Sequence, residues 1–254
     1  MISTVDPEAR HGHKTHAKGF DGCKGHVAVD PDSEIITDTA VTPGNAGDAG
    51  VAEELMSDLL AEEHAEAATG HGDNAYGTGD FQRHLEDEGI ESRCKTQKPN
   101  VTNGLFKKER FDVDLEDDTV TCPAGVTVST RRHSDGGGIA KFAEACASCA
   151  LRAQCTTAKE GRSIAVGPNE PVLSRARARQ KHTEWIADYR ATRPKVERKI
   201  AHLMRRKHGG RRARVRGRVR VAADFKLLAA AVNLARLGRL GARSTHTGWS
   251  VAGA

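Results

Sequence analysis

The chain has 254 residues, of which 37% are hydrophobic and 4% aromatic, and its formal net charge is +5 at pH 7. This length is enough for one large domain or two smaller ones. The scarcity of aromatic side chains argues against nucleic-acid recognition by base stacking, and no apolar run reaches the roughly eighteen residues of a transmembrane helix.

Charge is separated along the chain. Residues 47–91 contain thirteen Asp or Glu and one base, whereas residues 189–220 contain fourteen Lys or Arg and one acid, Glu197. This separation predicts a directed field whose basic end meets a polyanion, through phosphate contacts. Because the N-terminal residues lack an apolar signal core, we expect a cytoplasmic, nucleoid-associated protein without a membrane partner.

The first hundred residues alternate strand and helix patterns. Residues 26–41 alternate apolar and polar side chains around a DPDS turn, which predicts a β-hairpin, and residues 51–63 predict an amphipathic helix. A strand that ends at Gly72 and Asp73, a helix over 80–88 and a strand over 90–95 would form a βαβ unit. An Asp at the carboxyl end of such a strand lies where α/β sheets keep their sites, although a turn or cap role is commoner.

Residues 98–167 differ in character from the segments on either side. Turn residues and short β-prone pieces predict a β-rich insertion, and it contains four cysteines: Cys122, Cys146, Cys149 and Cys155. Two of them form a Cys-x2-Cys pair, so the four thiolates suit a structural Zn²⁺ site. The spacing of the other two is irregular, and buried free thiols are the alternative.

Helical patterns dominate the rest of the chain. Residues 173–191 predict a basic helix, and residues 221–239 predict a C-terminal helix that is buried on most faces. Between them, an apolar stripe predicts a further helix with one buried face, formed by Tyr189, Val196, Ile200 and Leu203.

Pro194 lies within this middle helical pattern. Because proline disrupts a helix interior, we expect the helix to start or kink there, which would place Glu197 within about one turn of an N-terminus. Arg193 and Glu197 are spaced i, i+4, so an ordinary surface ion pair is the alternative to a site.

Three segments together resemble bacterial insertion-sequence transposases of the DDE superfamily: GHGDNAY, YRATRPKVERKIAHLMRRKHGGRRARVRG and AAAVNLARL. Supporting matches are DPEARHGHKT, GHVAVD, VTPGNAGD and TCPAG…CASCALRAQC, so the likeness runs from about Asp6 to Arg239. Its most specific part combines Asp73 and Tyr76 of the G-D-x-A-Y motif with the order Tyr189, Arg193, Glu197.

The resemblance implies an α/β fold: a ribonuclease H-like mixed sheet with flanking helices, interrupted by a small β-rich, Cys-containing insertion. Residues 1–97 would begin this domain without its first strand, and residues 98–167 would be the insertion. Residues 168–241 would be the helical remainder with the basic DNA-binding segment, followed by a disordered tail over 242–254.

The implied activity is DNA transposition by phosphodiester hydrolysis and strand transfer, with two Mg²⁺ or Mn²⁺ ions. Asp73 matches the second metal-binding acid of the family and Glu197 the third; carboxylates suit such hard ions. Double-stranded DNA, at transposon ends and target, is the implied partner of a homodimer. The residues expected to contact DNA are Tyr189, Arg193, Arg205, Lys207, Arg211, Arg212, Arg214 and Arg216.

The sequence departs from the family in two places. Met204 stands where the family usually has Lys, with Arg205 next to it. No apolar strand precedes DPEAR to carry the first acid, for which Asp6, Asp21 and Asp30 are the available substitutes. We therefore expect a truncated copy with an incomplete acid triad and little strand cleavage. A non-catalytic DNA-binding transposase remnant is the alternative.

Overall fold

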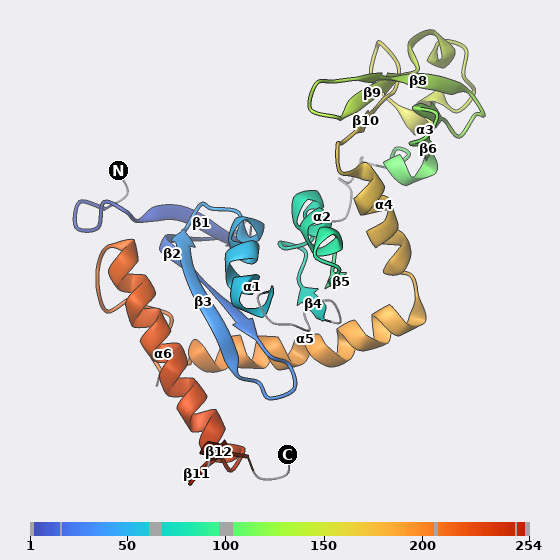
Figure 1. The fold of residues 1–254 in the computed structure, drawn as a ribbon. Helices are drawn as coiled ribbons and strands as arrows, with labels where there is room; N and C mark the ends of the chain where they lie inside the picture. The colour runs from blue at the N-terminus through green and yellow to red at the C-terminus, as the bar shows by residue number, and fades with distance from the viewer. Residues whose placement is uncertain are drawn as a thin grey trace.

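The computed structural model describes residues 3–15, 17–60, 68–96, 104–205, 208–246 and 248–251. Helices and several small sheets alternate along these residues, so the predicted α/β class is confirmed (Figure 1). None of the described helices is both long enough and apolar enough to cross a bilayer.

The N-terminal sheet contains β1 (Arg10–Thr15), β2 (Lys18–Val29) and β3 (Ile36–Pro43), with β2 in the middle. Both neighbours run antiparallel to β2, but they cover different parts of it. β1 pairs with the first part, up to Gly22, and β3 pairs with the rest, from Cys23 onward. The predicted hairpin is confirmed as β2 and β3.

A βαβ unit follows the first helix. Its elements, after α1 (Ala52–Leu60), are β4 (Thr69–Gly72), α2 (Gly79–Asp87) and β5 (Glu91–Cys94). β4 and β5 pair in parallel, as predicted. The Thr78 hydroxyl accepts a hydrogen bond from the Phe81 N–H and caps α2, which fixes where the turn after β4 ends.

The described strands form four separate sheets, so the single mixed sheet expected from the resemblance is not found within them. β1–β3 and β4–β5 are the two sheets of the N-terminal half. No described strand lies between β2 and β4, and without one their backbone ladders do not join.

The β-rich segment has a sheet and a core of its own, and it stands apart from the N-terminal sheets in Figure 1. Its antiparallel strands are β6 (Asp112–Asp114), β7 (Thr119–Thr121), β8 (Thr127–Arg132), β9 (Gly138–Lys141) and β10 (Ser163–Val166). The one-turn helix α3 (Arg152–Cys155) precedes β10. Phe111, Val120, Phe142 and Ile164 are buried in this core together with two cysteines.

Three helices form most of the C-terminal part: α4 (Glu170–Arg179), α5 (Thr183–Leu203) and α6 (Arg218–Arg239). The predicted helix over 173–191 is wrong as one element, because the chain breaks between α4 and α5. Pro194 lies inside α5, so the expected helix start there is also wrong. Glu197 is several turns from the N-terminus of α5, and the helix dipole does not act on it.

Only one face of α6 is buried, so the prediction of burial on most faces is wrong. Phe225, Ala229 and Val232 pack against β3 and the end of α5, whereas Leu227 is 69% and Leu234 70% exposed. After α6, where we expected disorder, β11 (Arg243–Thr245) and β12 (Gly248–Ser250) form a short hairpin.

Candidate metal and nucleic-acid site

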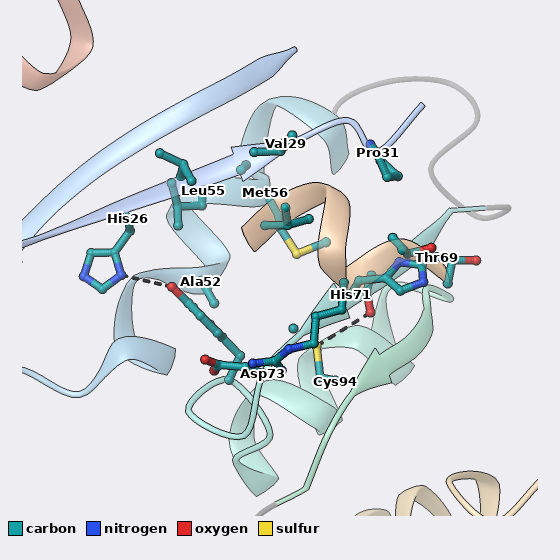
Figure 2. A pocket seen from close by; sticks show the side chains of 18 of the residues that line it. His26, Val29, Pro31, Ala52, Leu55, Met56, Thr69, His71, Asp73 and Cys94 are labelled. Carbon is teal, nitrogen blue, oxygen red and sulfur yellow. Dashed lines mark hydrogen bonds between the residues drawn. The ribbon is translucent and has the colours of Figure 1, made fainter. Parts of the chain in front are cut away.

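A cavity of about 360 Å³ lies between the two small sheets (Figure 2). Residues 25–29 of β2 line it, and so do residues 68–72 of β4 together with Asp73. Leu55 and Met56 of α1 contribute apolar surface. The lining from α5 consists of Tyr189, Thr192, Arg193, Val196, Glu197 and Ile200.

Asp73 lies at the rim of this cavity, immediately after β4. Its Oδ1 accepts a hydrogen bond from the Ala75 N–H at 2.8 Å, and its carbonyl accepts one from the Tyr76 N–H at 3.1 Å. The turn role that competed with a site role is therefore real. It also fixes where the carboxylate sits, since only one of its two oxygens is used by Ala75.

Glu197 lines the same cavity from α5, with 58% of its side chain exposed. Its Oε1 accepts a hydrogen bond from Arg193 Nε at 2.6 Å, so the surface ion pair is also present. Arg193 hydrogen-bonds the Tyr189 hydroxyl as well, and its guanidinium lies 5.6 Å from the centre of that ring. These contacts raise the pKa of Arg193 although its burial opposes the shift.

The two predicted acids thus converge on one cavity, and their oxygens are the hard ligands that Mg²⁺ and Mn²⁺ prefer. Within the described part of the chain, however, no three His, Cys, Asp or Glu side chains are grouped so that they could hold a metal. The chain therefore supplies two fitting carboxylates but not a complete ligand set.

The three substitutes for the first acid have other partners and do not line the cavity. Asp6 accepts a hydrogen bond from the Gly217 N–H at 3.3 Å, and Asp21 pairs with His11 at 2.7 Å. Asp30 accepts bonds within its own turn, from the Asp32 and Ser33 N–H groups.

A buried histidine in the cavity wall was missed by the sequence analysis. His26 is 5% exposed, and its ring nitrogens hydrogen-bond the Tyr76 hydroxyl at 3.0 Å and the Thr42 hydroxyl at 2.8 Å. Burial lowers the pKa of His26 and raises that of Tyr76. The signal was present in the sequence, because His26 lies in GHVAVD and Tyr76 in GDNAY.

An ion-pair cluster that joins the βαβ unit to α5 was also missed. Asp188 Oδ2 lies 2.8 Å from His71 Nε2 and 3.0 Å from Arg93 Nε. Burial alone would raise the pKa of Asp188, but the bonds from His71 and Arg93 hold it below its ordinary value. The cluster fixes α5 against β4 and β5, one residue before Tyr189.

All four predicted zinc ligands line one small cavity in the β-rich segment. Burial raises the pKa of Cys155; the nearby Arg162 lowers it, and the charges of the three other thiolates raise it further. The Arg162 N–H donates a hydrogen bond to Cys146 Sγ at 3.4 Å, an arrangement that stabilises a thiolate. The described cysteines still do not form a group ready to hold a metal.

The predicted DNA-contacting residues fall into two sets. Tyr189 and Arg193 line the cavity, whereas the basic side chains beyond α5 are exposed. Arg214 pairs with Asp224, and Lys207 lies outside the described residues. The exposed members are Arg205, Arg211, Arg212, Arg214 and Arg216.

Comparison with known families gave one match. The family described as Transposase DDE domain matches residues 121–238. The matched stretch contains the β-rich segment and Glu197, and Asp73 lies before it. No curated protein and no solved structure matches the chain. The predicted relationship to DDE-superfamily transposases is confirmed by this match.

Proposed function

We propose that this chain, a relative of the DDE-superfamily transposases, binds double-stranded DNA at transposon ends and target. In this proposal its ribonuclease H-like domain holds divalent ions with Asp73 and Glu197. The observation that carries it is that two acids far apart in sequence line one cavity. The reaction class is phosphodiester hydrolysis followed by strand transfer.

The proposed ions are Mg²⁺ or Mn²⁺, which activate an attacking water or hydroxyl and stabilise the leaving oxygen when bound. Asp73 and Glu197 would be their protein ligands. The hydrogen bond from Arg193 orients the Glu197 carboxylate toward the cavity. Because the described lining contains two carboxylates, we expect weak ion binding and little strand cleavage by this chain alone.

The proposed DNA contacts are the exposed arginines between α5 and α6. Their guanidinium groups are free to form charge-assisted hydrogen bonds with phosphates, which fix position rather than sequence. In the β-rich segment, Zn²⁺ held by the four thiolates would stabilise a sheet with a small core of its own. A homodimer would place one such site on each transposon end.

A supercoiled-plasmid nicking assay with Mg²⁺ or Mn²⁺, run beside a gel-shift assay, tests the proposal. We expect salt-sensitive DNA binding and slow nicking that is lost in Asp73→Ala. Rapid cutting that is abolished by Asp73→Ala would contradict the incomplete acid set. Absence of DNA binding at low salt would contradict the DNA-directed function itself.

A DNA-binding protein without metal chemistry is the second candidate function. The two-carboxylate lining favours it, because a third hard ligand is missing from the described residues. It predicts DNA affinity that responds neither to Mn²⁺ nor to Glu197→Ala. A gel-shift titration of both proteins with and without Mn²⁺ separates the two candidates.

A further inference from the structure

The cavity between β2 and β4 has two strand edges as its sides. Five consecutive residues line it from β2, 25–29, and five from β4, 68–72. A side wall made of side chains alone would contribute alternate residues of a strand, whereas consecutive residues indicate that the backbone edge faces the space. We propose that the cavity is a slot for one extended β-strand supplied by a second polypeptide, which we call the strand slot.

Strand pairing within the described residues supports this proposal. β3 covers β2 from Cys23 to Val29 on one edge, and β1 covers the other edge only up to Gly22. β4 pairs with β5 and with no other described strand. Each strand therefore keeps one edge of unpaired N–H and C=O groups beside the slot, and such edges recruit further strands.

The slot is covered on both faces by apolar side chains. Ala28 packs against Leu55 of α1, whereas its neighbours Val27 and Val29 belong to the cluster of Leu203 at the end of α5. Since successive strand residues point to opposite faces, α1 and the end of α5 lie on opposite sides of the sheet.

The apolar stripe of α5 shows that this space is underfilled. Tyr189, Val196 and Ile200 belong to the stripe predicted to be buried, yet they line the slot, and Ile200 is 40% exposed. A strand in the slot would cover them. It would be apolar on both faces, as a strand between two helix layers must be.

An extended peptide fits this site better than a small apolar ligand, because only a peptide backbone can satisfy both edges at once. We assign to the occupant one acidic residue, placed beside Asp73 and Glu197. This assignment rests on the proposed function. Three carboxylates repel one another unless a cation joins them, so the contribution of this acid to binding must depend on a divalent ion.

Fluorescence anisotropy tests the strand slot with a labelled peptide of about nine residues. The peptide alternates Val, Ile and Thr, with one central Asp, and two comparison peptides carry Asn or Pro at its centre. We expect saturable binding of the Asp and Asn peptides, and hydrogen-exchange protection of both 25–29 and 68–72. The Pro peptide, which breaks strand pairing, should bind at least about tenfold more weakly.

Ile200→Glu is the blocking variant, because Ile200 lines the slot but is exposed enough for the chain to fold without its side chain. It should weaken peptide binding by about tenfold. Leu227→Glu makes the same change on the exposed face of α6, which does not line the slot, and should bind as the unaltered chain does. Circular dichroism confirms folding of both variants.

Three results would overturn the strand slot: no saturable binding, protection of one edge only, or equal binding by Ile200→Glu. Protection of both edges in the peptide-free chain as its concentration rises would assign the site to a second copy instead, and would also overturn it. Mn²⁺ should tighten binding of the Asp peptide alone. If both peptides bind equally with Mn²⁺, the strand slot stands and the proposed metal function fails.

Discussion

At the residue scale, buried polar contacts set the shape of the cavity rim. His26 joins β2 to the turn that carries Asp73, through its hydrogen bond with Tyr76. The sequence predicted the importance of Asp73 and Tyr76 from their motif, but not this contact, because their partner lies fifty residues away on another sheet. Pairing between distant segments leaves no local pattern in a sequence.

Titration of His26 should make stability depend on pH. Burial lowers its pKa in the folded chain, so below the ordinary value of 6.5 the unfolded chain binds more protons and stability falls with pH. His26→Gln should lose less stability than the unaltered chain between about pH 8 and about pH 5.5 in urea unfolding. The carboxylates with lowered pKa act below about pH 4.5, outside this window. An equal loss in both proteins would contradict the role of His26.

Gly77 should be required for the turn after Asp73. A Cβ on Gly77 would lie 1.9 Å from the Lys95 carbonyl oxygen, and backbone on both sides cannot yield to it. Gly77→Ala should therefore lower the melting temperature, by an amount equivalent to about 2 kcal/mol or more. Gly50→Ala is the matched control, because nothing lies near its added methyl group. Equal melting temperatures for the two variants would show that the turn relaxes freely.

At the element scale, α5 organises the molecule. Trp185 Nε1 donates to the Ser92 carbonyl of β5 at 3.2 Å, and Leu203 at its other end is fully buried against the N-terminal sheet. The apolar period predicted this helix, but Pro194 suggested a boundary inside it. Tertiary packing at both ends overrides the local preference of one proline, and a single-sequence argument cannot weigh that packing.

Glu170 should anchor α4 to the segment before β6. Its carboxylate is 6% exposed as a residue and accepts bonds from Lys108 Nζ at 2.6 Å and Arg177 Nη1 at 2.9 Å. Although burial opposes it, these two bonds lower the pKa of Glu170. Glu170→Gln should reduce the free energy of unfolding by about 2 kcal/mol, since two cations lose their counter-charge. The exposed Glu144→Gln should change it by less than about 0.5 kcal/mol, and equal effects would contradict the anchor.

At the scale of the whole molecule, charge separation predicted from the sequence becomes a spatial one. The acidic stretch forms α1, α2 and the turn at Asp73, whereas the exposed arginines follow α5. Motifs predicted the family and both cavity acids, because each motif is local. The split between the β1–β3 and β4–β5 sheets was not predictable, since it depends on which strand edges meet after folding.

DNA affinity should depend on salt through the exposed arginines. Replacing Arg211, Arg212 and Arg216 with Ala should reduce the slope of log affinity against log salt by about two to three. A control with the same charge change replaces Arg131, Lys141 and Lys159, which are exposed on the β-rich segment. Fluorescence anisotropy with one duplex at several salt concentrations measures both slopes. If the two triple variants weaken binding equally, net charge and not this segment determines affinity.

The most direct measurement of the central claim is a calorimetric titration of the DNA-free chain with Mn²⁺. We predict weak binding that falls by at least about tenfold in Asp73→Asn and in Glu197→Gln, with no further loss in the double variant, because both acids hold the same ions. Asp58→Asn, which neutralises an exposed acid of α1, should bind as the unaltered chain does. Binding that is unchanged in both single variants, or lost equally in Asp58→Asn, would contradict a shared site for Asp73 and Glu197.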